Sequence, residues 1–98
     1  MEVRFIDQDL DRLETDPNFD GGHSQGVVKA FRKRMQQIRS APDERDFYAI
    51  KSLHFEKLHA KRSYKYSMRL NDQWRLILEF EGEGAEKGVM IIGIEDYH

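Results

Sequence analysis

The chain has 98 residues, of which 35% are charged and 39% hydrophobic, and its formal net charge is −2. This length suits one core, so we expect residues 1–98 to form a single domain. The absence of cysteine excludes disulfides and thiolate sites, and no apolar run approaches the roughly 20 residues that span a membrane. The N-terminal residues show no basic-then-apolar signal, so we expect a cytoplasmic protein with no membrane contact.

Charge is distributed unevenly along the chain. Residues 1–20 and residues 76–98 each carry a formal charge of −5, whereas residues 51–75 carry +5 and residues 21–50 carry +3. The local field, rather than the net charge, attracts a polyanion. The basic segment 51–75 therefore favours a nucleic acid as partner, and the alternative is a solvated surface of mixed sign.

The first half of the chain is predicted to contain one strand and two helices. Residues 3–6 are typical of a short strand, and Leu10 and Leu13 belong to a first helix that ends before Pro17. Ser24 is expected to cap a longer second helix, whose apolar positions recur at helical spacing. These positions are Val27, Val28, Phe31, Met35 and Ile38.

The second helix is expected to end at Ala41-Pro42, and residues 43–50 to form a short helical turn. The last third is predicted as three strands: residues 64–70, 73–80 and 89–95. The order βααβββ defines an α+β fold in which helices pack on one face of a small, mostly antiparallel sheet. The last strand is apolar on both faces, which is typical of a central strand. Its pattern leaves open on which face Asp96 and His98 lie.

The first hairpin has a register that the sequence predicts more sharply. A three-residue loop at Asn71-Asp72-Gln73 places Met68 opposite Leu76 on one face and Arg69 opposite Arg75 on the other. A two-residue loop would mix apolar and polar side chains on both faces. We therefore predict the three-residue loop, which also pairs Tyr64 with Phe80.

This register brings two arginines together, because directly opposed residues have Cβ atoms roughly 4.5–5.5 Å apart and like charges there repel. One solution is a neighbouring carboxylate, for which Glu79, Glu95 and Asp96 are candidates. The other is a bound phosphate, which two guanidinium groups can grip. The sequence leaves both solutions open.

Several kinds of site are not indicated by the sequence. It contains no HExxH motif, no cysteine cluster and no glycine-rich loop between a strand and a helix, so we predict no metal and no cofactor. The terminal Asp96-Tyr97-His98 and the arginines suit acid–base cleavage of RNA, in which the 2′-hydroxyl is the nucleophile. Taken alone, these three residues are better explained as a solvated polar terminus with a packed tyrosine.

Two segments resemble the HigB-type killer toxins of the RelE superfamily. They are Ser67-Met68-Arg69-Leu70-Asn71-Asp72-Gln73-Trp74-Arg75 and the terminal Asp96-Tyr97-His98. The resemblance implies a compact α+β fold and ribosome-dependent cleavage of mRNA in the ribosomal A site. It also implies inhibition by a helix-turn-helix antitoxin and a toxin–antitoxin complex able to bind operator DNA.

The resemblance assigns roles to individual residues. Arg75 corresponds to the arginine that contacts the scissile phosphate, and Asp96, Tyr97 and His98 to the terminal active-site residues. We expect His98 to be the general acid, Asp96 to orient groups or act as base, and Tyr97 to hold the substrate. Further phosphate contacts are expected from Arg69, Lys57, Lys61, Arg62 and Lys65.

The segment Leu58 to Arg62 departs from the family pattern of Leu-Lys-Gly-Asp-Arg. His59 stands in the place of the lysine and is a candidate catalytic residue whose charge depends on pH near neutrality. Ala60 and Lys61 replace the glycine and the aspartate. Two alternatives to an active nuclease follow. One is a noncatalytic RNA- or ribosome-binding inhibitor of translation, and the other is a weakened toxin that serves mainly as the antitoxin's partner. The role of His54 stays open.

Overall fold

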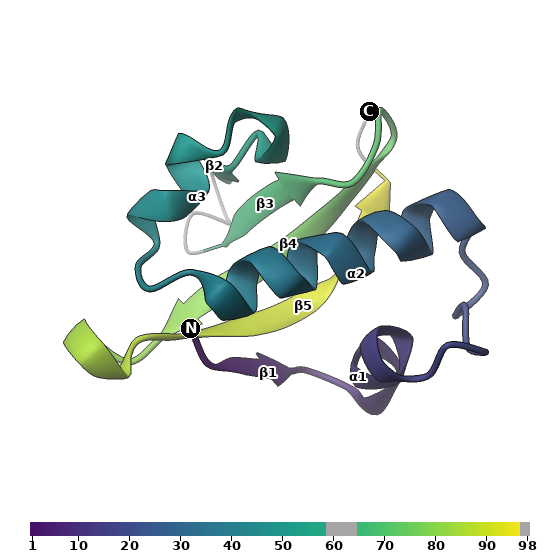
Figure 1. Cartoon of the computed structure of the whole chain (residues 1–98), viewed down its shortest axis with the longest axis horizontal. Coiled ribbons are helices and arrows are strands. Elements are labelled where there is room, and N and C mark those ends of the chain that lie inside the picture. Colours follow the sequence, from purple (N-terminus) through teal and green to yellow (C-terminus); the bar gives the residue numbers. More distant parts are fainter. Residues whose placement is uncertain (59–64, 97–98) are drawn as a thin grey trace.

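The computed structural model describes residues 1–58 and 65–96 and forms a layer of helices on one sheet (Figure 1). The strands described are β1 (Val3–Phe5), β2 (Glu56–Lys57), β3 (Tyr66–Arg69), β4 (Trp74–Glu81) and β5 (Gly88–Asp96). The helices described are α1 (Gln8–Thr15), α2 (Gln25–Ser40) and α3 (Arg45–Ala49), with 3-10 turns η1 (Lys51–Leu53) and η3 (Gly84–Glu86). The predicted α+β class is confirmed.

The strands lie in the order β1-β5-β4-β3-β2. β1 pairs with β5 in parallel, and the other pairs are antiparallel, so the predicted mostly antiparallel sheet is confirmed. The strand predicted to be central, β5, does lie between two neighbours. The sequence reasoning missed β2, which among the described residues pairs with Tyr66 and Ser67 of β3.

The register of the β3–β4 hairpin is the predicted one. Met68 is paired with Leu76 and Arg69 with Arg75. The Leu70 amide donates to the Trp74 carbonyl at 2.9 Å, and the Asn71 side chain accepts from the Trp74 amide at 2.7 Å. The turn is therefore closed by a side chain, as asparagine commonly does. The predicted Tyr64–Phe80 pair lies outside the described residues.

A bulge in β5 determines which side chains face which side of the sheet. Leu78 of β4 is paired with Ile91, and its neighbour Ile77 is paired with Gly93. Ile92 therefore has no partner on β4 and is the extra residue of the bulge. A bulge of this kind reverses the alternation beyond it. As a result Asp96 is opposite Trp74, whereas Glu95 is opposite Arg75.

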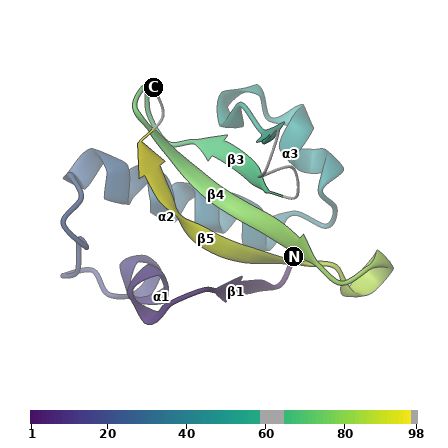
Figure 2. The same cartoon turned by 180° about the vertical axis from the view of Figure 1, so that it is seen from behind.

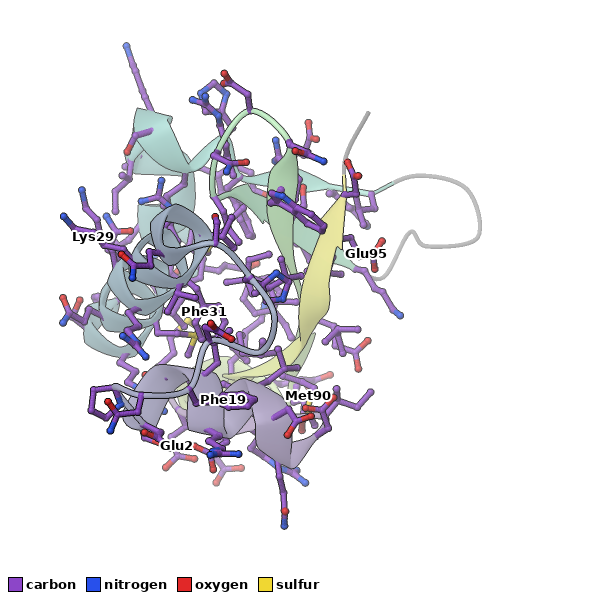
Figure 3. The ribbon with its side chains drawn as sticks, turned by 90° about the vertical axis from the view of Figure 1, so that its right-hand side faces the viewer. Glu2, Phe19, Lys29, Phe31, Met90 and Glu95 are labelled. Atoms are coloured by element: carbon purple, nitrogen blue, oxygen red, sulfur yellow. The ribbon has the colours of Figure 1, made fainter. Side chains whose placement is uncertain are left out.

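The hydrophobic core lies between α2 and one face of the sheet. Phe31, Met35 and Ile38 of the predicted α2 stripe are 0% exposed, and Phe31 points from the helix towards the strands (Figure 3). Seen from behind, β3, β4 and β5 carry no helix of the described chain on their other face (Figure 2). Ile77 is buried on that second face and is not part of the main core cluster.

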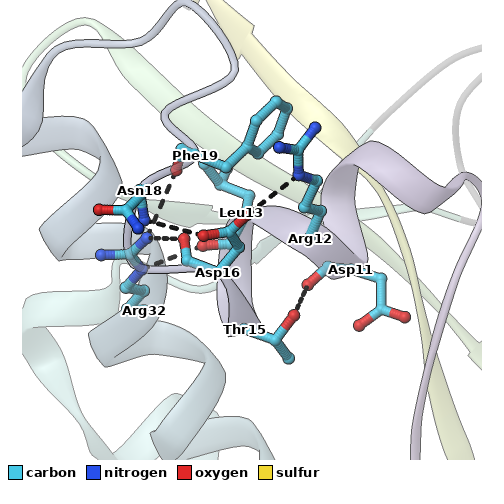
Figure 4. Close-up of polar contacts among 8 residues, drawn as sticks. All are labelled: Asp11, Arg12, Leu13, Thr15, Asp16, Asn18, Phe19 and Arg32. Atoms are coloured by element: carbon cyan, nitrogen blue, oxygen red, sulfur yellow. Dashed lines mark hydrogen bonds and ion pairs between the residues drawn. The ribbon is translucent and has the colours of Figure 1, made fainter.

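An arginine of α2 joins this helix to the end of α1. Arg32 donates from Nε to the Leu13 carbonyl at 3.0 Å and from Nη2 to the Asp16 carbonyl at 2.9 Å (Figure 4). The Asp16 carboxylate in turn accepts from the Asn18 amide at 2.9 Å and from Arg12 Nε at 3.2 Å. The Asn18 hydrogen bond, followed by that of Arg12, lowers the pKa of Asp16 below its ordinary value.

The lowered pKa of Asp16 predicts a pH-dependent stability contribution. A carboxyl group with a depressed pKa in the folded state stabilises the fold above its unfolded pKa of about 3.9, and this contribution is lost as the pH falls through the folded pKa. Asp16→Asn should therefore lower the stability at pH 7, and the difference from wild type should shrink below about pH 4. Urea unfolding between pH 2 and pH 7 measures this. A difference that grows as the pH falls would contradict it.

Gly82, at the start of the β4–β5 connection, has a φ of 72°. A Cβ added there would lie 2.9 Å from the Glu86 carbonyl oxygen. Gly82→Ala should therefore destabilise the fold by about 1–2 kcal/mol in urea unfolding. The same change at Gly26 in α2, where the nearest atom is Ser24 Oγ at 4.0 Å, should stabilise it by about 0.5–1 kcal/mol. Equal effects at the two sites would show that backbone conformation is not the cause.

Candidate functional site

The face of the sheet on which no described helix packs carries the side chains that alternate with the core residues, and we call it the helix-free face. It is defined by Ser67 and Arg69 of β3, Arg75 and Ile77 of β4, and Glu95 of β5. Figure 3 shows Glu95 and Met90 projecting from β5 on the side away from α2. Arg75, the residue that the resemblance assigns to the scissile phosphate, therefore lies on this face between Arg69 of β3 and Glu95 of β5.

The Arg75 guanidinium is held by three neighbouring groups, which we call the Arg75 site. Its Nη2 donates to the His54 carbonyl at 2.6 Å and to the Ser67 hydroxyl at 2.9 Å. The same nitrogen lies 3.6 Å from Oε1 of Glu56. Arg75 is only 8% exposed, and the Glu56 side chain is about half exposed. A positive charge is thus fixed at one position, with a carboxylate beside it that solvent can reach.

His54 supplies its carbonyl to the Arg75 site because the chain turns sharply there. It is the C-cap of η1 and adopts left-handed backbone angles, with φ 45° and ψ 48°. These angles are uncommon outside glycine, although histidine is among the residues enriched there. The imidazole is exposed. The structure thus places the His54 main chain, rather than its ring, against Arg75.

The two opposed arginines are accompanied by carboxylates, which is one of the two solutions expected from the sequence. Arg69 forms an ion pair with Asp72 of the β3–β4 turn, and Arg75 pairs with Glu56. Neither carboxylate is one of those considered in the sequence analysis. Asp72 is almost fully exposed, and an exposed ion pair of this kind contributes little to stability.

The other predicted site residues lie in different places. Asp96 is on the opposite face from Arg75, where its exposed carboxylate accepts from Gln73 Nε2 at 3.1 Å. Lys57 is exposed on β2 and opposite Tyr66, and the Lys65 carbonyl accepts from the Leu58 amide. The structure does not bring these three residues into contact with Arg75. The remaining predicted residues lie outside the described residues: His59, Lys61, Arg62, Tyr97 and His98.

The sequence reasoning missed three parts of the Arg75 site. Ser67 could have been found, since the predicted register places it two residues from Arg69 on the same face as Arg75. Glu56 could not, because a two-residue strand leaves no periodic pattern. The His54 carbonyl depends on one unusual backbone conformation, for which the sequence contains no signal.

Within residues 1–58 and 65–96, no three His, Asp or Glu side chains come together in a way that would hold a metal ion. Among the helices that the structure describes, none is long and apolar enough to cross a membrane.

The fold is that of known toxins. The structure resembles a YoeB/ParE toxin from Agrobacterium tumefaciens, with a TM-score of 0.62 and 15% sequence identity over 100% of both chains. It also resembles the YoeB dimer protein from Staphylococcus aureus, with a TM-score of 0.53 and 16% identity over 100% of this chain and 97% of that one. A comparison with curated proteins found no match.

The family follows from the sequence as well as from the fold. Residues 3–98 match the model of the RelE-like toxin of type II toxin-antitoxin system HigB. The chain belongs to this family and is a toxin of a type II toxin–antitoxin system, which confirms the resemblance noted in the sequence. Toxins of this type pair with a protein antitoxin, and members of the family are generally endoribonucleases.

Proposed function

We propose that this toxin is a ribosome-dependent mRNA endoribonuclease that stops translation by metal-independent acid–base cleavage. The observation that supports this most directly is the Arg75 site, in which a fixed guanidinium lies beside a half-exposed carboxylate on the helix-free face. Such a pair offers both a phosphate ligand and a proton acceptor. The reaction needs no bound cofactor, because RNA supplies its own nucleophile.

Arg75 would bind a non-bridging oxygen of the scissile phosphate and stabilise the charge that develops on it. A donor already held in place costs no reorganisation during the reaction. The two N–H groups of Nη2 already donate to His54 and Ser67, so the phosphate would lie beside the guanidinium as an ion pair, where Glu56 now lies 3.6 Å from Nη2. Arg69, across the hairpin, would bind the same phosphate or its neighbour.

The 2′-hydroxyl must lose its proton to a group near that phosphate. Asp96, considered for this role from the sequence, lies on the other face of the sheet, whereas Glu56 is in contact with Arg75. We therefore assign the general base to Glu56, and Asp96, which is opposite Trp74, keeps the expected role of orienting groups. His98 remains our candidate for the acid that protonates the leaving 5′-oxygen, with Tyr97 holding the substrate and His59 close to the phosphate.

The wider interface would be formed by cations around the Arg75 site. Lys57, Lys61, Arg62 and Lys65 would contact phosphates of mRNA or rRNA, so binding should weaken as the salt concentration rises. In this proposal residues 1–98 act as one domain in the cytoplasm. A helix-turn-helix antitoxin inhibits the toxin, and the resulting complex binds operator DNA.

The proposed function is tested by mapping mRNA 5′ ends after the purified toxin is added to a translating extract and to the same mRNA without ribosomes. We expect new ends within codons in the first reaction and few in the second. Inhibition of protein synthesis without new ends would favour the noncatalytic inhibitor instead. Absence of both inhibition and cleavage would favour a toxin that serves mainly as the antitoxin's partner.

A further inference from the structure

Arg34 is a buried arginine of α2 that contacts the main chain of two other elements. It is only 8% exposed. Its Nε donates to the Arg69 carbonyl at 2.9 Å, and its Nη2 lies 3.4 Å from the Ser52 carbonyl. Its Nη1 donates to Oε1 of Gln37, one turn along the same helix, at 3.0 Å. One guanidinium therefore joins α2, η1 and the end of β3.

The charge of Arg34 is costly where it lies. Among the residues that the structure describes, it pairs with no carboxylate, and its three partners are neutral oxygens. Burial, and then the nearby Arg69, lower the pKa of its side chain. A buried cation without a counter-ion opposes folding unless its hydrogen bonds compensate. An apolar residue would fill the same position on α2 without that cost, so the two main-chain contacts are what distinguishes arginine here.

Both main-chain contacts belong to segments that border the Arg75 guanidinium. Ser52 lies in η1, two residues before the His54 carbonyl to which Arg75 donates. Arg69 is directly opposite Arg75 in the hairpin.

The Arg69 carbonyl needs a donor from outside the sheet. The Leu70 amide donates to the Trp74 carbonyl, so Leu70 faces β4, and the preceding residue, Arg69, directs its carbonyl away from β4. In the described part of the chain, β2 pairs with Tyr66 and Ser67, and this pairing does not extend to Arg69. Arg34 supplies the donor that a longer β2 would have supplied.

We propose that Arg34 is a positioning residue for Arg75: its planar fork holds η1 and the end of β3 at a fixed separation, and thereby fixes the His54 carbonyl and the strand that border the Arg75 guanidinium. The expected effect of Arg34 on cleavage rests on the proposed function of Arg75. Its effect on the position of the Arg75 guanidinium does not. Lysine cannot replace arginine in this role, because a single ammonium cannot span two carbonyls with fixed geometry.

The test compares wild type with Arg34→Lys and Arg34→Gln. The first readout is the NMR signal of the Arg75 Nε–Hε group in the free toxin, assigned by its loss in Arg75→Lys. The second is single-turnover cleavage of mRNA on programmed ribosomes. We expect the Arg75 signal to shift and broaden in both Arg34 variants. We expect kcat to fall about 10- to 100-fold with KM little changed, as small misplacements of a catalytic group do.

Arg32→Lys is the matched control. Arg32 is also on α2 and also donates to main-chain carbonyls, but those belong to Leu13, Asp16 and Phe19, in and after α1 (Figure 4). We expect this variant to lose stability while the Arg75 signal and kcat stay as in wild type. The experiment thus separates positioning of Arg75 from a general weakening of the fold.

The outcomes divide clearly. An unchanged Arg75 signal in the folded Arg34 variants, or an equal change in Arg32→Lys, would overturn the proposal. Failure of both Arg34 variants to fold, judged by far-UV circular dichroism, would assign Arg34 to overall stability and overturn it too. If the Arg75 signal moves but wild-type toxin cleaves no mRNA, the positioning role stands and the proposed function fails.

Discussion

Replacing Arg75 with alanine is expected to reduce single-turnover cleavage of mRNA on the ribosome about 10²- to 10³-fold, the usual effect of removing one preorganised donor to a developing negative charge. The loss should appear in kcat, because the guanidinium interacts most strongly with the charge that develops during the reaction. The substitution also leaves the His54 carbonyl and the Ser67 hydroxyl without this donor. We therefore expect the stability to fall by about 1–3 kcal/mol, with the fold retained.

Arg4→Ala is the matched control for this substitution. Arg4 on β1 is largely exposed and pairs with Glu81 at 3.2 Å, near the opposite end of β4 from the Arg75 site. Arg4→Ala changes the net charge of the toxin by the same amount as Arg75→Ala. Cleavage should be nearly unchanged in Arg4→Ala. A similar loss in both variants would mean that total charge, and not the Arg75 site, determines activity.

Glu56→Gln is expected to lower kcat about 10²- to 10⁴-fold, the range typical for loss of a general base. Glutamine keeps the size of the side chain and an oxygen that can accept from Arg75, but it cannot take up the proton of the 2′-hydroxyl. It also removes a negative charge that competes with the phosphate for Arg75 Nη2. KM should therefore stay constant or decrease while kcat falls, and single-turnover kinetics over a range of toxin concentrations measure both.

Glu95→Gln serves as the comparison for Glu56→Gln. Glu95 is on the same face and directly opposite Arg75 in the β4–β5 pair. We expect only a small change in kcat for this variant. A large loss in Glu95→Gln together with wild-type activity in Glu56→Gln would transfer the role of base to Glu95.

The hairpin that carries Arg69 and Arg75 could be predicted from the sequence because burial of one face enforces strict alternation. Only one loop length keeps Met68 and Leu76 together on the core side, and the structure has that register. The face of Asp96 could not be predicted in the same way. The bulge at Ile92 reverses the alternation late in β5, and its apolar neighbours on both faces conceal it.

The partners of Arg75 were hidden for a different reason. Glu56 belongs to a two-residue strand that exists only because β3 pairs with it, and the His54 carbonyl depends on a left-handed backbone conformation. Arg34 lies three residues after Phe31 and four before Ile38, so helical spacing places it beside the buried stripe of α2, but the spacing does not show which groups its guanidinium contacts. Its role follows from tertiary contacts with η1 and β3.

The most direct test of the proposed cleavage uses one mRNA programmed in the ribosomal A site, prepared either with ribose or with 2′-deoxyribose at the nucleotide that is cut. If the 2′-hydroxyl is the nucleophile and the protein supplies acid and base, the ribose mRNA is cleaved and its upstream fragment ends in a 2′,3′-cyclic phosphate, while the deoxy mRNA stays intact. Equal cleavage of both mRNAs, or no cleavage of the ribose mRNA, would contradict the mechanism proposed for this toxin.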